Sequence, residues 1–160
     1  MSPSRRICFV CSGNIVRSPL AEHLFRRMTE QAGIEDQYQV ASAGTAVWKA
    51  GSSPDMRMRR VAASHGLEYD GRSRRFESRH LEDYDMILAM DLENWTSLMT
   101  MARTSEQRAK IHMLREFDPK GGQRAGVPDP YYGGVLGFEE AYQTVARSLV
   151  GLLDALEGSI

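Results

Sequence analysis

The chain has 160 residues, a formal net charge of −1, and hydrophobic and charged shares of 42% and 26%. These values describe an ordinary globular protein, and we expect residues 1–160 to form a single domain. They provide no domain-wide basic excess for nucleic-acid binding, and no apolar run approaches the roughly 20 residues of a membrane-spanning helix. We therefore expect neither nucleic acid nor a membrane as a partner.

Cysteine usage indicates the compartment. The chain has two cysteines, Cys8 and Cys11. A secreted disulfide framework is therefore not expected, and a reducing cytoplasm is the natural location. The apolar stretch before Ser12 is also too short for the core of a signal peptide. We expect a cytoplasmic protein and a monomer, although no feature of the sequence fixes the oligomeric state.

Short apolar runs alternate with helical patterns along the chain. We predict strands at residues 6–10, 38–43, 84–90 and 111–114, and helices at residues 18–32, 55–65, 77–81, 91–101 and 138–156. A loop rich in glycine and proline occupies residues 121–132. This order predicts an α/β fold of the flavodoxin or Rossmann type, with a parallel sheet covered by helices on both faces.

The first predicted helix has clear start signals. Ser18 suits the N-cap position, Pro19 the first helical position and Glu22 the first turn. In a parallel sheet, ligands bind outside the carboxyl ends of the strands. Cys11 follows the first predicted strand, so chemistry is expected there.

One pattern in this segment is Cys8-x-x-Cys11, the spacing of a redox or metal-binding pair. In an extended segment the two residues lie about 10 Å apart, whereas a disulfide needs Cα atoms within roughly 7 Å. Their side chains would also point to opposite faces of the sheet. A zinc site needs two further ligands, and the four histidines are scattered. We interpret Cys8 as a buried core residue and expect no metal and no cofactor.

The overlapping pattern is Cys11-x5-Arg17, a loop that can hold an oxyanion over a thiolate. Because it leads from a strand into a helix, several backbone N–H groups can converge on one anion. Arg17 can bind two phosphate oxygens, and the Ser18 hydroxyl can donate to the thiolate. Gly13 permits close approach, and Asn14 tolerates a left-handed backbone. Around the nucleophile Cys11 and the phosphate ligand Arg17, the predicted phosphate-binding loop consists of Ser12, Gly13, Asn14, Ile15, Val16 and Ser18.

Cleavage of a phosphate ester also needs an acid for the leaving oxygen. The best candidate is Asp129, in the segment "VPDPYYG" at residues 127–133. Two prolines stiffen this segment, and its tyrosines can line a hydrophobic pocket. On its own the segment is a common turn signal, so its significance depends on pairing with the Cys11 loop.

These motifs together resemble the low-molecular-weight protein tyrosine phosphatase family. The resemblance rests on "VCSGNIVRSPLAE" at residues 10–22 and "DPYYGG" at residues 129–134. Further segments look like family segments in the family's order: "SAGTAVW" at 42–48, "SPDMR" at 53–57, "YDMILAMD" at 84–91 and "LREFDP" at 114–119. The resemblance therefore covers nearly the whole chain.

The resemblance implies a four-stranded parallel sheet and a metal-independent mechanism in two steps. Cys11 would attack phosphorus and form a phosphocysteine, while Arg17 holds the phosphoryl oxygens. Asp129 would protonate the leaving phenolate and then activate water. The family's aromatic rim, which would grip a phosphotyrosine ring, is matched by Trp48, Tyr131 and Tyr132. The implied substrate is a phosphotyrosine protein or an aryl phosphate.

Three positions bear on how this chain differs from its relatives. Val16 stands where the family usually has a second cysteine, so Cys11 lacks that partner against over-oxidation. Many relatives carry Gly-His where this chain has Gly71-Arg72, which leaves open how the loop asparagine is held. The apolar Ile15 favours phosphotyrosine over phosphoarginine, because relatives acting on phosphoarginine have threonine there.

Other functions stay open. An arsenate reductase on the same fold would need two further cysteines after Cys11 or an external thiol, and this chain has no later cysteine. A phosphoarginine phosphatase would share the same loop. A phosphate-binding module that has lost catalysis would not need Cys11, Arg17, Ser18 and Asp129 together. A cysteine protease would need a partner histidine, which nothing in the sequence designates.

Overall fold

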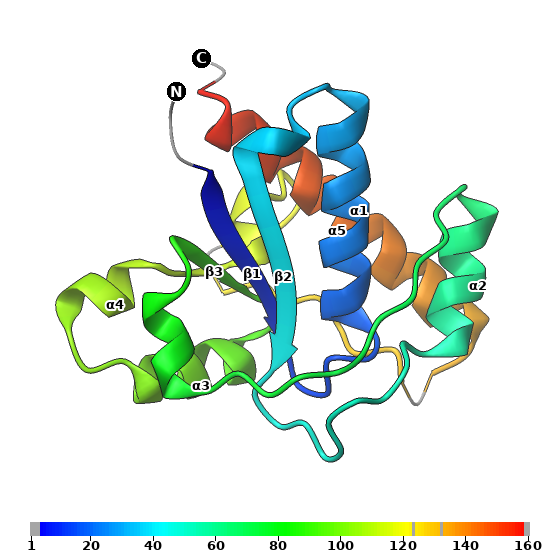
Figure 1. Ribbon diagram of the computed structural model, residues 1–160. Helices are drawn as coiled ribbons and strands as arrows, with labels where there is room; N and C mark the ends of the chain where they lie inside the picture. Colours follow the sequence, from blue (N-terminus) through cyan, green and yellow to red (C-terminus); the bar gives the residue numbers. More distant parts are fainter. Residues whose placement is uncertain (1–3, 123, 132, 159–160) are drawn as a thin grey trace.

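The computed structural model describes residues 4–122, 124–131 and 133–158. Its strands are β1 (Arg5–Cys11), β2 (Tyr38–Gly44), β3 (Met86–Ala89) and β4 (Ile111–Met113), all parallel, in the order β2-β1-β3-β4 (Figure 1). Central strand β1 is buried from Ile7 onward, because helices cover both faces of the sheet. The predicted fold class, a four-stranded parallel sheet flanked by helices, is confirmed.

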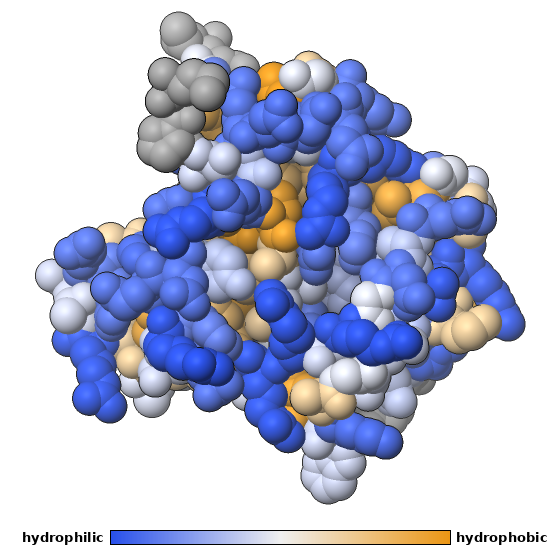
Figure 2. Space-filling model, in the orientation of Figure 1, coloured by the Kyte–Doolittle hydropathy of each residue, from blue (hydrophilic) through white to orange (hydrophobic). Residues whose placement is uncertain are grey.

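The helices divide between the two faces (Figure 1). On one face lie α1 (Arg17–Gln31), α2 (Met56–Ser64) and α5 (Val135–Leu156), and on the other lie α3 (Leu92–Met101) and α4 (Ser105–Ala109). The 3-10 helices are η1 (Glu35–Gln37), η2 (Ser78–Glu82) and η3 (Leu114–Phe117). In the described part of the chain, no helix is long and apolar enough to cross a membrane. Figure 2 shows a mainly hydrophilic surface on this side, with hydrophobic atoms gathered beside the edge strand β2.

Each face of the sheet has its own hydrophobic core. Phe9, Cys11 and Phe138 belong to the cluster under α1 and α5, whereas Cys8 and Leu98 belong to the cluster under α3. The two cysteines therefore point to opposite faces, as alternation along a strand requires. Helix α5 turns one buried stripe toward the sheet, and this stripe includes Ala141, Val145, Leu149 and Leu152.

The chain topology places a crevice between β1 and β3. The chain leaves β1 for α1 on one face and leaves β3 for α3 on the other face. Ligands of such sheets bind where these connections diverge. Cys11 ends β1, and Asp91, the N-cap of α3, follows β3. Residues far apart in sequence thus meet at the same edge of the sheet.

Several element boundaries differ from the prediction. Helix α1 begins at Arg17 with Val16 as an N-cap that makes no side-chain bond, so the assignment of Ser18 as N-cap was wrong. Ser18 lies in the first turn, where its hydroxyl contacts Cys11 instead. Helix α5 begins at Val135 rather than at residue 138. The predicted helix at 77–81 is the 3-10 helix η2, and α4, η1 and η3 were missed because they are too short to show periodicity.

Candidate active site

Contacts with neighbouring segments fix the backbone of the loop between β1 and α1. Asn14 has φ of +55°, the left-handed conformation that the sequence predicted it could adopt. The N–H of Ala46 donates to the carbonyl of Ser12 (2.9 Å), and the N–H of Asp55 donates to that of Ile15 (2.7 Å). Within the described residues, the N–H groups of positions 13–16 have no protein acceptor. A run of unoccupied N–H groups before a helix N-terminus is suited to bind an oxyanion.

Cys11 lies at the centre of this loop. Its Sγ is 2.9 Å from Ser18 Oγ, and both side chains are almost completely buried. The amide of Asn14 donates to Ser18 Oγ (2.8 Å), so the hydroxyl proton of Ser18 has two acceptors within reach, the Cys11 sulfur at 2.9 Å and the Ala43 carbonyl at 3.4 Å. The predicted contact between Ser18 and the sulfur of Cys11 is thus present in the structure.

Arg17 is 2% exposed and fixed by groups from distant segments. Its Nη1 donates to Asp91 Oδ2 (2.7 Å) and to the carbonyl of Val127 (2.9 Å), and its Nη2 lies 3.5 Å from Asp129 Oδ2. Its Nε is buried and has no partner among the described residues. An unpaired buried N–H costs about 1–3 kcal/mol, so such a group in a native structure needs an explanation. A ligand oxygen in the adjoining pocket would supply the missing acceptor.

That pocket has a volume of about 480 Å³, and Cys11 and Arg17 line it. Asp129 and Tyr131 border it from one loop, and Trp48 borders it from another. The Asp129 side chain is 47% exposed and the Trp48 residue 96% exposed, so the rim is open to solvent while the floor is buried. Of the remaining predicted residues, the pocket lining includes Gly13, Ile15 and Val16. Tyr132 lies outside the described residues.

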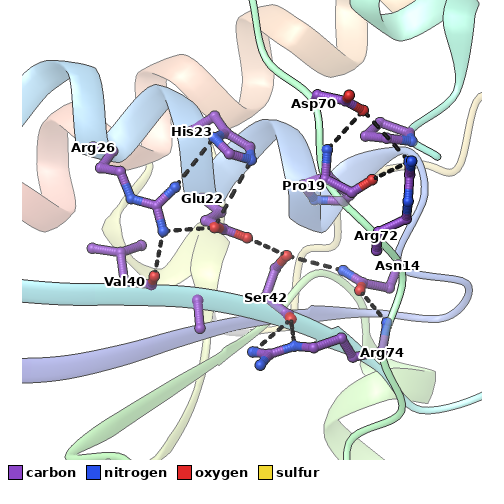
Figure 3. A pocket seen from close by; sticks show the side chains of 13 residues that line it. Asn14, Pro19, Glu22, His23, Arg26, Val40, Ser42, Asp70, Arg72 and Arg74 are labelled. Atoms are coloured by element: carbon purple, nitrogen blue, oxygen red, sulfur yellow. Dashed lines mark hydrogen bonds and ion pairs between the residues drawn. The ribbon is translucent and has the colours of Figure 1, made fainter. Parts of the chain in front are cut away.

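A chain of polar side chains braces the loop from behind. Asn14 Nδ2 donates to Ser42 Oγ (3.0 Å), and Asn14 Oδ1 accepts from the N–H of Arg74 (2.8 Å). Ser42 Oγ donates to Glu22 (2.6 Å), which pairs with Arg26 (2.7 Å). Figure 3 shows this chain along a second pocket of about 290 Å³. The loop asparagine is thus held by the backbone N–H of Arg74 and by two serines, Ser18 and Ser42, although Gly71-Arg72 lacks the histidine of many relatives.

The sequence analysis did not predict two contacts that support the loop. A Cβ at Gly44 would lie 2.4 Å from the carbonyl oxygen of Ser12, so the end of β2 can approach the loop only as glycine. The amide of Asn94, fully buried on α3, contacts Ser12 Oγ at 3.0 Å. Asp91 was also missed as the partner of Arg17, although an acid directly after a buried strand was a usable signal. Each of these contacts joins distant segments, so the pairing of the residues depends on the fold and not on any one segment.

Cys8 takes no part in this site. It is fully buried and free, and burial raises the pKa of the Cys8 thiol to about 12. Its interpretation as a core residue is confirmed. Within the described residues, no group of three or more His, Cys, Asp and Glu side chains is arranged as a metal site would require.

Comparison with known proteins places this site in a family. The profile of the family "Low molecular weight phosphotyrosine protein phosphatase" matches residues 6–159. The chain belongs to this family. The resemblance that the sequence motifs indicated is therefore confirmed.

Relatives in this family match along almost the whole chain. A low molecular weight protein-tyrosine-phosphatase of Streptomyces coelicolor is 40% identical over 156 residues, which cover 97% of this chain and 95% of the relative. The low molecular weight protein-tyrosine phosphatase A of Mycobacterium tuberculosis is 38% identical over 155 residues, with 96% and 93% covered. The crystal structure of a protein tyrosine phosphatase from Entamoeba histolytica matches with a TM-score of 0.90 and 33% identity, over 98% of this chain and 100% of that one.

Proposed function

We propose that this chain is a metal-independent protein tyrosine phosphatase whose nucleophile is Cys11. One observation carries the proposal. The Cys11 sulfur lies beside the Ser18 hydroxyl, under a pocket into which unpartnered N–H groups of the loop and of Arg17 can donate. This arrangement suits a phosphoryl group, whose oxygens accept the hydrogen bonds while sulfur faces phosphorus. Family membership independently supports the same class of reaction.

In the first step, the Cys11 thiolate forms a bond to phosphorus while the bond from phosphorus to the phenolic oxygen breaks. Arg17 and the loop N–H groups hold the equatorial oxygens, on which negative charge gathers. Asp129 gives its proton to the leaving oxygen. Its position supports this role, because its carboxyl group lies at the pocket rim, 3.5 Å from the guanidinium of Arg17.

In the second step, water attacks the phosphocysteine. Asp129, now a carboxylate, takes a proton from the water, and the new bond to oxygen forms as the bond to sulfur breaks. Inorganic phosphate leaves, and the Cys11 thiolate is restored. The Ser18 hydroxyl, 2.9 Å from the sulfur, stabilises the thiolate as it departs.

The pocket walls favour an aryl substrate. Trp48 and Tyr131 provide aromatic surface at the rim, and Ile15 adds an apolar wall near the floor. Such surfaces bind a phenyl ring by apolar burial and ring contacts. The apolar Ile15 also favours phosphotyrosine over phosphoarginine.

The remaining features of the proposal concern the protein as a whole. We propose that residues 1–160 act as one phosphatase domain, without a cofactor, and that Tyr132 contributes to the rim. A cytoplasmic location is supported by the two free thiols. We expect the enzyme to act as a monomer on phosphotyrosine proteins.

A parallel assay of several substrates tests this proposal. Phosphotyrosine, phosphoserine and phosphoarginine peptides of equal length are incubated with enzyme in EDTA, and released phosphate is measured. We expect the wild-type enzyme to release phosphate from the phosphotyrosine peptide. The Cys11→Ser variant should release none. Preference for the phosphoarginine peptide would contradict the substrate assignment. Arsenate-dependent thiol oxidation without phosphatase activity would indicate a reductase, and tight phosphate binding without turnover a binding module.

A further inference from the structure

The segment that carries Asp129 is anchored at one end and exposed beyond it. We call residues 127–131 the acid loop. Val127 is fully buried, and its N–H donates to the carbonyl of Met90 (2.6 Å). Farther along the loop, the Asp129 side chain is 47% exposed and Tyr131 is 39% exposed. An acid on such a loop acts at a fixed place only if contacts from other segments hold the loop over the pocket.

Arg57, in the first turn of α2, supplies such contacts. Its Nη1 donates to the carbonyl of Tyr131 (2.9 Å). Its guanidinium carbon also lies 5.0 Å from the centroid of the Tyr131 ring and 4.6 Å from that of Phe138, an arrangement in which a cation is attracted to the aromatic face. The N–H of Tyr131 in turn donates to Asp129 Oδ1 (3.1 Å). Arg57 therefore fixes the residue whose own N–H orients the Asp129 carboxyl group.

A carboxylate fixes Arg57 itself. Asp55 is the N-cap of α2, and its side chain is 9% exposed. Its two oxygens accept from Nε (3.2 Å) and Nη2 (2.9 Å) of Arg57, a bidentate pair that leaves Nη1 for the acid loop. Burial acts to raise the pKa of Asp55, but the hydrogen bonds from Arg57 outweigh it and hold this pKa below its ordinary value. The pair is therefore ionised across the neutral range.

Asp55 also contacts the phosphate-binding loop, so these contacts close into a ring. Its backbone N–H donates to the carbonyl of Ile15 (2.7 Å). Two residues after Ile15, Nη2 of Arg17 lies 3.5 Å from Asp129 Oδ2. Ile15, Arg17 and Asp129 all line the active-site pocket. The two loops are thus joined directly through Arg17 and indirectly through Asp55 and Arg57.

Arg57 is not placed to act on the substrate by its own charge. The cations in the described lining of the pocket are Arg17 and Lys49. Arg57 lies outside this lining, and Asp55 neutralises its charge. Any effect of Arg57 on the reaction must therefore pass through the residues that it contacts.

We propose that Arg57 is a positioning residue for the proton donor, and that it holds the acid loop where Asp129 reaches the leaving oxygen. This inference rests on the proposed function. Without Arg57 the acid loop keeps its anchor at Val127 but loses the contacts at Tyr131. Small misplacements of a reacting group cost large factors in rate, so proton transfer from Asp129 should slow.

The test compares two substrates that differ in their need for the acid. Phenolate is a poor leaving group and requires protonation, whereas p-nitrophenolate departs without it. In Arg57→Met, kcat/KM should fall about tenfold for phenyl phosphate and no more than about twofold for p-nitrophenyl phosphate. A general loss of structure would lower both values alike, so the ratio between the substrates reports positioning.

A double variant tests whether the effect passes through Asp129. When Asp129→Asn has removed the proton, adding Arg57→Met should change kcat/KM for phenyl phosphate by no more than about twofold, because no proton transfer is left to position. Arg57→Lys keeps a cation near the rings but cannot form the bidentate pair, so it should recover part of the loss. The lysine variant also carries the test should Arg57→Met fail to fold.

Arg60→Met is the matched control, because Arg60 is exposed on the same helix. It should keep kcat/KM for both substrates within about twofold of wild type. Unchanged phenyl phosphate hydrolysis in Arg57→Met and Arg57→Lys, equal losses on both substrates, or fully multiplicative losses in the double variant would each overturn the proposal. Absence of p-nitrophenyl phosphate hydrolysis by the wild-type enzyme would instead refute the proposed function itself.

Discussion

Arg17 and Asp118 stand at the centres of two buried clusters of arginine and carboxylate. Arg17 pairs with Asp91 at 2.7 Å but keeps a buried Nε that has no partner among the described residues. The Asp118 carboxylate is fully buried and accepts two hydrogen bonds from Arg147, one from Arg115 and one from the N–H of Lys120. One cluster is incomplete and faces a pocket, and the other is complete. Incomplete pairing is thus what distinguishes the candidate site from an otherwise similar structural cluster.

The complete cluster serves the fold. Asp118 follows η3, Arg147 lies on α5, and their contact fastens the long last helix to the end of the sheet. The hydrogen bonds from Arg147, together with those from Lys120 and Arg115, lower the pKa of Asp118 to about 2. This cluster is therefore expected to govern stability, and the Arg17 cluster is expected to govern activity.

Replacing each arginine by lysine tests that division most strongly. Arg17→Lys keeps the charge but removes the planar donor pair and Nε, so kcat/KM for p-nitrophenyl phosphate should fall about a thousandfold. Arg147→Lys should keep kcat/KM within about threefold and lower the melting temperature by several degrees. Similar activity losses in the two variants would break the comparison.

Replacement of Asp129, the second carboxylate beside Arg17, should cause the next largest loss of activity. Asp129→Asn removes the proton donor, so kcat/KM for phenyl phosphate should fall about a hundredfold. The loss should be smaller for p-nitrophenyl phosphate, whose leaving group departs without protonation. Asp154→Asn, a change at an exposed position of α5, is the control. Equal losses on both substrates would argue against a role for Asp129 as the acid.

The complete cluster predicts a pH dependence of stability. The pKa of Asp118 is lower in the folded protein than its ordinary value of 3.8, so the unfolded chain binds more protons between these values. The ionised Asp118 carboxylate therefore stabilises the folded protein by about 2 kcal/mol above pH 4. This contribution is lost as the pH falls toward 2. Urea unfolding at a series of pH values measures this loss. In Asp118→Asn this component should vanish, and a curve that kept its slope there would assign the loss to other groups.

Substitutions of Asn14 should have a smaller effect on activity. They separate the contribution of its side-chain hydrogen bonds from that of its left-handed backbone. Asn14→Gly keeps the left-handed backbone but removes the hydrogen bonds to Ser18, Ser42 and Arg74, so kcat/KM should fall about tenfold. Asn14→Ala should be worse by a further several-fold, because alanine resists positive φ. Steady-state kinetics of the two variants compare these terms directly. Equal activity in both would show that backbone conformation is unimportant here.

The sequence predicted the parts of the molecule that local physics controls. The strand before Cys11, the left-handed Asn14 and the contact between Cys11 and Ser18 all follow from neighbouring residues. The partners of Arg17 do not, since Asp91 and Val127 come from other connections of the sheet. Only their three-dimensional placement shows that Arg17 is fixed on one side and unpaired on the other.

The error at Ser18 has the same origin. A serine before Pro19 is a good N-cap on local grounds, and the helix nevertheless begins two residues earlier, with Val16 as the N-cap and without any side-chain cap. Capping would use the hydroxyl that Cys11 and Asn14 engage. It would also occupy helix N–H groups that a phosphate can use. The local rule fails where the site makes a competing demand on the same atoms.

The central claim is that the incomplete cluster around Arg17 and Cys11 holds a phosphoryl group during turnover. Rapid quenching of the enzyme with a phosphotyrosine peptide, followed by peptide mapping in the mass spectrometer, tests it directly. The account predicts a phosphoryl group on the sulfur of Cys11 that forms and decays within the turnover time. Continued turnover with no phosphorylated Cys11, or with the phosphoryl group on another residue, would contradict it.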